Sequence, residues 1–169
     1  GNGDGTFRPV ESLTLGKSRY SVAVADVNGD GKPDVIKTNL RQNSLSVELG
    51  TGSGSFEPGL TVEVGPQPTS VSVADFNADG RLDLVTTNSD ADSVSVALGN
   101  GDGTFNAQQT FDVGRSPREV AIADINGDGR PDLAVTNYND GTVSVLLGRG
   151  DGSFGTQQTF PVGQRPYSL

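Results

Sequence analysis

The sequence of 169 residues contains no Cys, His, Met or Trp. Without Cys there is no disulfide framework and no thiolate nucleophile, and without His there is no imidazole to activate a nucleophile or to bind zinc. Serine-protease-like and zinc-hydrolase mechanisms are therefore unsupported. The sequence also has no run of about 18 apolar residues, so it predicts no transmembrane helix, and no signal-peptide pattern is present.

One nine-residue pattern occurs three times, starting at residues 26, 75 and 124 and therefore every 49 residues. Oxygen-bearing side chains occupy positions 1, 3, 5 and 9, and glycine occupies position 6 in every copy. Ca²⁺ accepts six to eight oxygen ligands in a flexible shell, whereas Mg²⁺ requires a stricter octahedron. The pattern therefore predicts one Ca²⁺ ion in each loop, about three in all. The predicted ligands are the side chains of Asp26, Asn28, Asp30 and Asp34, of Asp75, Asn77, Asp79 and Asp83, and of Asp124, Asn126, Asp128 and Asp132, with the backbone carbonyls of Lys32, Arg81 and Arg130.

Two alternatives to a calcium loop are an EF-hand and a plain turn. An EF-hand needs a bidentate Glu at position 12 and a helix on each side, but position 12 is Lys37, Thr86 or Val135 and the flanks are rich in Val and Ser. A plain turn is the other alternative, because Asn, Asp and Gly tolerate left-handed backbone angles. Three copies that keep the same four oxygens while the intervening residues vary favour a metal site.

The acidic character of the chain is confined to these loops. The formal net charge is −9, and nine Asp lie in the three loops, which leaves 12 acidic residues against 12 basic ones elsewhere. Three bound divalent cations would bring the charge from −9 to −3. No basic stripe exists to neutralise phosphates, so nucleic acid is not an expected partner.

A second marker, Gly-x-Gly-x-Gly-x-Phe, starts at residues 1, 50, 99 and 148 and keeps the same period. Period-2 alternation on both sides of each Asp loop predicts two strands, so each loop is a hairpin connection. A third strand, the glycine-rich hairpin and a fourth strand complete the unit, with Phe160 and Val162 among the residues expected to point inward and the marker Phe expected to cover the end of the blade. A 49-residue unit of four strands has the length of a propeller blade.

The sequence therefore predicts an all-β fold, a β-propeller segment made of four-stranded antiparallel blades. Residues 17–65, 66–114 and 115–163 form three whole blades, residues 1–16 end a preceding blade, and residues 164–169 start the next. A fourth complete unit would need 27 more residues, so we expect residues 1–169 to be a segment of a longer array. An open array of stacked blades is the alternative, because repeats that contact only their neighbours need not close.

The Asp-x-Asn-x-Asp-Gly-x-x-Asp loop, preceded by a Val-Ala strand, resembles the FG-GAP and VCBS-type repeats of bacterial surface proteins, which are related to the blades of integrin alpha-chain propellers. The resemblance covers the whole chain. Phe154-Gly155 keeps the name-giving pair, and Gly114 to Pro117 is a looser Gly-Ala-Pro, whereas the first unit lacks this proline at Arg19. The resemblance implies a calcium-binding β-propeller, usually of about seven blades, in secreted or cell-surface proteins that adhere, scaffold or present other domains.

These observations predict a non-enzymatic, calcium-binding, extracellular repeat module for adhesion or scaffolding, with calcium stabilising the hairpins of the blades. A carbohydrate-binding lectin propeller and the accessory propeller of a larger secreted enzyme are the alternatives. The expected partner is a protein or glycan at the cell surface. Carboxylate pairs suited to glycosidase chemistry occur only inside the Asp loops, where a cation would keep them ionised, so no catalytic residue is expected.

Three smaller sequence features are expected to have structural roles. Arg149-Gly150-Asp151 spells a tripeptide that integrins recognise, but sister units read Asn-Gly-Asp there, so one Asn-to-Arg change accounts for it. Asp102 and Asp151 are expected to form turns and not a second metal site. The three Tyr (Tyr20, Tyr138 and Tyr167) are few for a lectin site, and the repeat position shared by Tyr20 and Tyr167 indicates packing at the start of a blade.

Overall fold

The computed structural model describes residues 21–169, apart from the side chain of Pro58. The expected end of a preceding blade at residues 1–16, the first glycine-rich marker and Tyr20 lie outside the described residues. Within residues 21–169 the regular structure consists of strands, and no helix in this range could cross a membrane.

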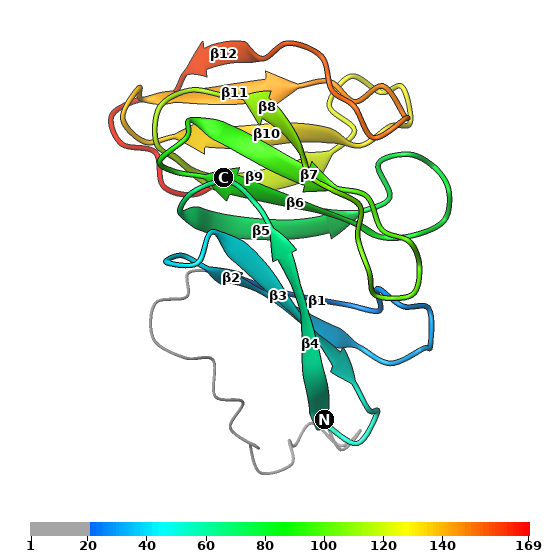
Figure 1. Cartoon of the computed structure of the whole chain (residues 1–169). Helices are drawn as coiled ribbons and strands as arrows, with labels where there is room; N and C mark the ends of the chain where they lie inside the picture. The colour runs from blue at the N-terminus through cyan, green and yellow to red at the C-terminus, as the bar shows by residue number, and fades with distance from the viewer. Residues whose placement is uncertain (1–20) are drawn as a thin grey trace, which may run out of the picture.

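Twelve strands form three separate four-stranded sheets, and the strands of each sheet are neighbours in the order of the chain (Figure 1). All the pairings are antiparallel, so each sheet is a series of hairpins. The all-β prediction of four-stranded antiparallel units is confirmed. The strands are β1 (Val22–Ala25), β2 (Asp34–Asn39), β3 (Ser44–Gly50) and β4 (Phe56–Glu63) in the first sheet, β5 (Pro68–Ala74), β6 (Asp83–Asn88), β7 (Ser93–Ala97) and β8 (Gln109–Asp112) in the second, and β9 (Pro117–Ala123), β10 (Asp132–Asn137), β11 (Thr142–Leu146) and β12 (Gln158–Pro161) in the third.

The three sheets stack face to face, and the apolar core lies between them (Figure 1). The first interface buries Ile36 and Leu45 of the first sheet against Leu84 of the second. The second interface buries Val94 against Leu133 in the same manner. The alternating strands of the sequence therefore present one apolar face to the preceding sheet and another to the following one. Within residues 21–169 the sheets are open and do not close into a ring, which fits a stack of blades.

The outer faces of this stack are not covered by a further sheet within residues 21–169. Phe160 and Val162 are 48% and 53% exposed, whereas Val113, one unit earlier than Val162, is 6% exposed. The expectation that Phe160 and Val162 point into a core is therefore wrong for this structure, because no sheet packs on that side. Val22 at the opposite face is likewise 45% exposed, although Val71 in the next unit is buried.

A buried Asn closes the hairpin between the second and third strands of each unit. Asn88 donates through Nδ2 to Ser93 Oγ at 3.1 Å and to Ser95 Oγ at 2.8 Å. Asn39 and Asn137 make the corresponding pair of bonds in the other sheets. These bonds satisfy the buried side-chain N–H groups and fix the end of each unit opposite its Asp loop, whereas Oδ1 of Asn88 and Oδ1 of Asn137 are buried without a hydrogen bond.

Candidate metal centre

The three Asp loops share one conformation, which the Asp at position 1 organises. Asp26 accepts backbone N–H bonds from Gly29 and Asp30 through Oδ1, at 2.8 and 3.1 Å, and from Gly31 through Oδ2 at 2.7 Å. Asp124 repeats all three bonds, and Asp75 repeats those from positions 5 and 6. The carboxylate at position 1 therefore lies at the centre of a curled loop, in the manner of an extended Asx turn.

The side chains at positions 3 and 5 and the glycine at position 6 stabilise the same curled conformation of the loop. Asn28 Oδ1 accepts the N–H of Asp30 at 3.1 Å, and Asp30 Oδ1 accepts the N–H of Lys32 at 2.9 Å. Equivalent bonds occur in the second and third loops. The glycines at position 6 have φ of +80°, +80° and +81°, in a region that side chains with a Cβ disfavour. The recurrence of glycine there is explained by the backbone alone.

The Asp at position 9 has a role that the sequence pattern did not reveal. Asp83 is fully buried, and its Oδ2 accepts the N–H of Phe76 at 2.8 Å while its Oδ1 accepts the N–H of Gly99 at 2.8 Å. Asp34 and Asp132 are equally buried and make the same two bonds, each at 2.9 and 2.8 Å. One carboxylate thus joins the Asp loop to the glycine-rich loop of the same sheet.

The first glycine of each glycine-rich marker is required at this junction. A Cβ on Gly99 would lie 2.2 Å from the carbonyl oxygen of Leu82, and Gly50 and Gly148 are equally close to the residue before their own Asp. In each unit the glycine follows the Asp at position 9 by 16 residues, as Gly99 follows Asp83. The close approach brings the N–H of the glycine within reach of the buried carboxylate, so the two repeated markers form one structural unit.

Burial, hydrogen bonds and neighbouring charges shift the pKa values of several carboxyl groups in the loops. Burial is the largest cause that raises the pKa of Asp83, and the negative charges of Asp79 and Asp75 raise it further, against the two N–H bonds that lower it. The pKa of Asp30 is lowered, first by the hydrogen bond from the Lys32 side chain, and that of Asp128 is lowered, first by Asn126. A cation in the loop would relieve the repulsion at Asp83.

The loops fit a hard cation in their donor chemistry, although no three acidic, His or Cys side chains of residues 21–169 converge as a ready-made metal cluster. All the predicted ligands are oxygens, as Ca²⁺ prefers. A carboxylate has about four acceptor positions, so the two N–H bonds of Asp83 leave it able to bind a cation as well. The carboxylates of Asp30, Asp79 and Asp128 are exposed at the surface of their loops. The ligand assignment remains a prediction.

The glycine-rich loops of the second and third units also lie against the Asp loop of the preceding unit. Gly152 donates its N–H to the carbonyl oxygen of Phe76 at 3.1 Å. The Phe154 ring packs edge-on against Phe76 at 5.5 Å and against Phe111 at 5.3 Å between ring centroids. Phe154 is thus buried against the second unit. The first two Asp loops therefore lie at junctions between sheets, where a bound ion could stabilise more than its own hairpin, whereas Ile125 of the third loop is 46% exposed.

The Arg-Gly-Asp tripeptide lies in the glycine-rich loop of the third unit and makes hydrogen bonds within its own turn. Arg149 donates through Nη1 to the carbonyl oxygen of Phe154 at 2.8 Å. Asp151 Oδ1 accepts from the N–H and the hydroxyl of Ser153, at 2.9 and 2.6 Å, and Asp102 makes the same two bonds with Thr104. These acids form turns in the structure, as sequence reasoning expected.

The chain belongs to the FG-GAP-like repeat family, whose model matches residues 1–37, 38–86, 75–135 and 124–169. No curated protein matches the chain in a sequence comparison. A protein of unknown function from Desulfotomaculum acetoxidans has a similar structure, with a TM-score of 0.72 and 13% identity over 91% of this chain and 45% of that one. The BBS1N chain of a complex with ARL6DN gives a TM-score of 0.62 and 13% identity over 88% of this chain and 46% of its own.

The Tc holotoxin pore of Photorhabdus luminescens also contains a similar segment, with a TM-score of 0.50 and 23% identity. The match covers 85% of this chain and 7% of the holotoxin chain. This chain thus spans less than half the length of each of these structures. At these identities the likeness shows a shared fold, a repeat module of the propeller type, and leaves activity and partners open.

Proposed function

We propose that this chain is a calcium-binding, non-enzymatic repeat module of an extracellular or cell-surface protein, where it serves adhesion or scaffolding. One observation carries the proposal: three loops with the same oxygen-rich pattern curl in the same way, and the first two lie at junctions between sheets. The oxygen-bearing side chains at positions 1, 3, 5 and 9 are held in place by backbone N–H bonds and keep further acceptor positions for a cation. Each loop brings a buried and two more exposed Asp together, and a divalent cation would neutralise their charge locally.

Calcium would act on folding more than on chemistry. The repulsion among three Asp of one loop opposes hairpin closure until a cation binds, so metal binding and folding are linked. In millimolar calcium, the weak sites typical of extracellular modules would each add about 0.6 to 2 kcal/mol to the free energy of unfolding. Because the calcium concentration inside cells is far below the dissociation constant of such sites, the mechanism suits a secreted or surface location. The partner would be a protein or glycan outside the cell.

Isothermal titration calorimetry on chelator-stripped protein tests this proposal directly. Calcium is expected to bind with a stoichiometry of about three per chain, and magnesium is expected to bind far more weakly. Combining Asp30→Ala, Asp79→Ala and Asp128→Ala should abolish the binding heat. The combined Asp102→Ala and Asp151→Ala variant is the matched control, because these Asp lie in the neighbouring loops and should leave calcium binding unchanged. A parent protein that binds no calcium, or a control that loses as much binding as the test variant, would contradict the proposal.

A further inference from the structure

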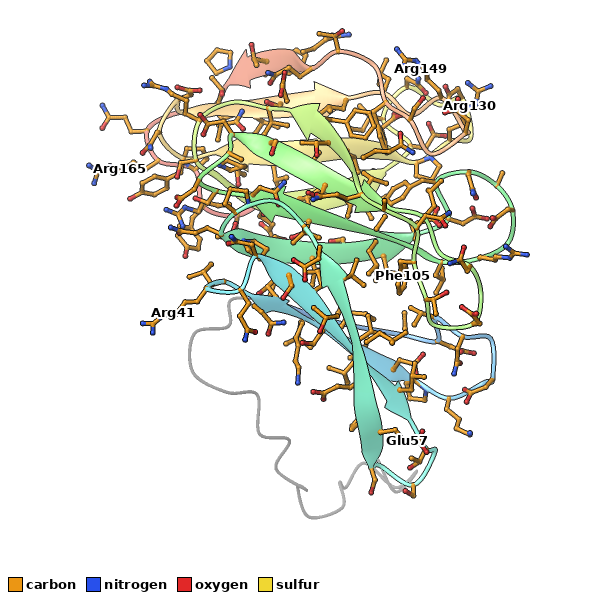
Figure 2. All side chains as sticks on the ribbon, in the orientation of Figure 1. Arg41, Glu57, Phe105, Arg130, Arg149 and Arg165 are labelled. Carbon is orange, nitrogen blue, oxygen red and sulfur yellow. The ribbon has the colours of Figure 1, made fainter. Side chains whose placement is uncertain are left out.

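A second candidate site lies at the end of the sheets opposite the Asp loops. Figure 2 shows Arg165 at this end, whereas Arg130 and Arg149, which belong to the Asp and glycine-rich loops, lie at the other. A hollow of about 240 Å³ opens here where the first strands of successive units begin. Arg118, Glu119 and Tyr167 line it together with the hydroxyl side chains of Ser21, Thr69, Ser70 and Ser168.

Two arginines and two tyrosines form a compact cluster beside the hollow, which we call the arginine–tyrosine cluster. The guanidinium of Arg118 lies 5.2 Å from the ring centroid of Tyr138 and 5.9 Å from that of Tyr167. The two rings meet edge-on at 6.2 Å, and the guanidinium of Arg165 lies 5.8 Å from the Tyr138 ring. The cluster therefore brings two positive charges to one pair of aromatic rings.

Neither arginine of the cluster has a carboxylate partner in the part of the chain that the structure describes. The ion pairs of residues 21–169 involve Lys32, Lys37 and Arg115, and not Arg118 or Arg165. The Nε of Arg118 is buried and makes no hydrogen bond there. A buried donor without an acceptor is unfavourable, and a charged donor more so. The cluster therefore carries two positive charges that no carboxylate of residues 21–169 neutralises in an ion pair.

Two residues of the cluster, Tyr138 and Arg165, occupy positions that vary from unit to unit. At the junction between the second and third sheets, the hydroxyls of Ser89 and Ser116 are hydrogen-bonded at 3.2 Å. One unit later, the same two positions hold Tyr138 and Arg165, 49 residues further along in each case. One unit earlier these positions hold Leu40 and Gln67, so the pair differs at all three places and the repeat packs without an aromatic or an arginine there.

Glu119 departs from the repeat in the same place. In the first two units a serine links neighbouring inner strands, since Ser21 Oγ accepts the N–H of Val71 and Ser70 Oγ accepts that of Val120. In the third unit Glu119 Oε2 accepts the N–H of Leu169 at 2.6 Å instead. The carboxylate keeps the structural bond and adds a charged acceptor to the wall of the hollow.

We propose that the arginine–tyrosine cluster and the adjoining hollow bind a saccharide that carries a carboxylate, such as a uronic acid. Arginine offers a planar fork of donors that pairs with a carboxylate in two parallel bonds. The exposed Tyr167 presents an aromatic face to the C–H groups of a sugar ring, and Glu119 and the surrounding hydroxyls can accept and donate to sugar hydroxyls. A peptide carboxylate would use the guanidinium but would leave this hydroxyl-rich wall unused.

The experiment is a titration of the full chain with galacturonic acid and a short oligogalacturonide, in calcium-containing buffer. Because the chain has no Trp and three Tyr, intrinsic tyrosine fluorescence reports on the cluster directly. Galactose and a neutral galactose oligosaccharide test the need for the carboxylate, and acetate tests the need for the sugar. The oligogalacturonide is expected to bind most tightly and to change the fluorescence, with little response to the neutral sugars or acetate at the same concentration.

Variants then locate the site. Arg118→Gln and Arg165→Gln should each weaken oligogalacturonide binding by about tenfold or more, since each removes a charge-assisted donor. Arg41→Gln is the matched control, because Arg41 is exposed at the same end of the sheets but outside the cluster (Figure 2). Melting temperatures check that each variant is folded, and Arg165, being exposed, can be changed with the least effect on packing. No binding by the folded parent protein, equal binding of the neutral sugar or acetate, or an equal loss in Arg41→Gln would overturn the proposal.

Discussion

Replacing Asp83 with Ala is expected to lower the free energy of unfolding by about 3 to 5 kcal/mol, even with all calcium removed by EDTA. The change leaves the N–H groups of Phe76 and Gly99 without the acceptor that each now reaches at 2.8 Å. Both N–H groups lie in a buried environment from which water is excluded. The effect therefore arises from the polypeptide itself and does not require a metal.

Urea unfolding in EDTA measures this loss. Asp79→Ala is the matched control, because Asp79 belongs to the same loop but is exposed, so its loss in EDTA should stay below about 1 kcal/mol. In saturating calcium both variants should be less stable than the parent protein. If Asp83→Ala and Asp79→Ala were equally mild in EDTA, position 9 would act through the metal alone, and the junction described above would carry no stability of its own.

Gly99→Ala is expected to destabilise the protein by at least about 2 to 3 kcal/mol. The added Cβ would lie 2.2 Å from the carbonyl oxygen of Leu82, and both atoms belong to backbone that neighbouring strands fix in place. Relief of the clash would require the glycine-rich loop to move away from Asp83 and would stretch the bond from the Gly99 N–H. The variant therefore combines a steric effect with the loss of a buried hydrogen bond.

Thermal and urea unfolding of Gly99→Ala against Gly155→Ala separates this effect from a general intolerance of glycine replacement. Gly155 lies in the third glycine-rich hairpin, where a Cβ would come no closer than 3.6 Å to the carbonyl oxygen of Leu147. We expect Gly155→Ala to change the free energy of unfolding by less than about 1 kcal/mol. Equal stability of the two variants would contradict the proposed close approach at Gly99.

The architecture could be predicted from the sequence because two periods mark it, the 49-residue repeat and the two-residue alternation within strands. The 49-residue repeat predicts the unit, and the patterns on both sides of each Asp loop predict two strands, where the structure has pairs such as β5 and β6. The Asp loop could be placed between the first and second strands for the same reason. Local patterns of this kind follow from backbone geometry and need no knowledge of distant contacts.

The junctions between loops could not be predicted in this way, since they depend on contacts across the chain. The pattern presented Asp83 as one more ligand, whereas the structure also gives it a buried role that links two loops. A signal was present, because every copy keeps a glycine 16 residues after this Asp, as at Gly99. The arginine–tyrosine cluster brings Arg118 next to Tyr138 and Tyr167 only through the stacking of sheets. The positions of Tyr138 and Arg165 hold different residues in each of the three units, so no repeated pattern in the sequence marks the cluster.

Thermal unfolding followed by circular dichroism, in millimolar calcium and then in excess EDTA, with magnesium as the control, tests the central claim most directly. The account predicts a rise in melting temperature that is specific to calcium and that disappears when Asp30→Ala, Asp79→Ala and Asp128→Ala are combined. If calcium left the melting temperature of the parent protein unchanged, the Asp loops would be turns held by their own hydrogen bonds, and calcium stabilisation of the blades would be refuted.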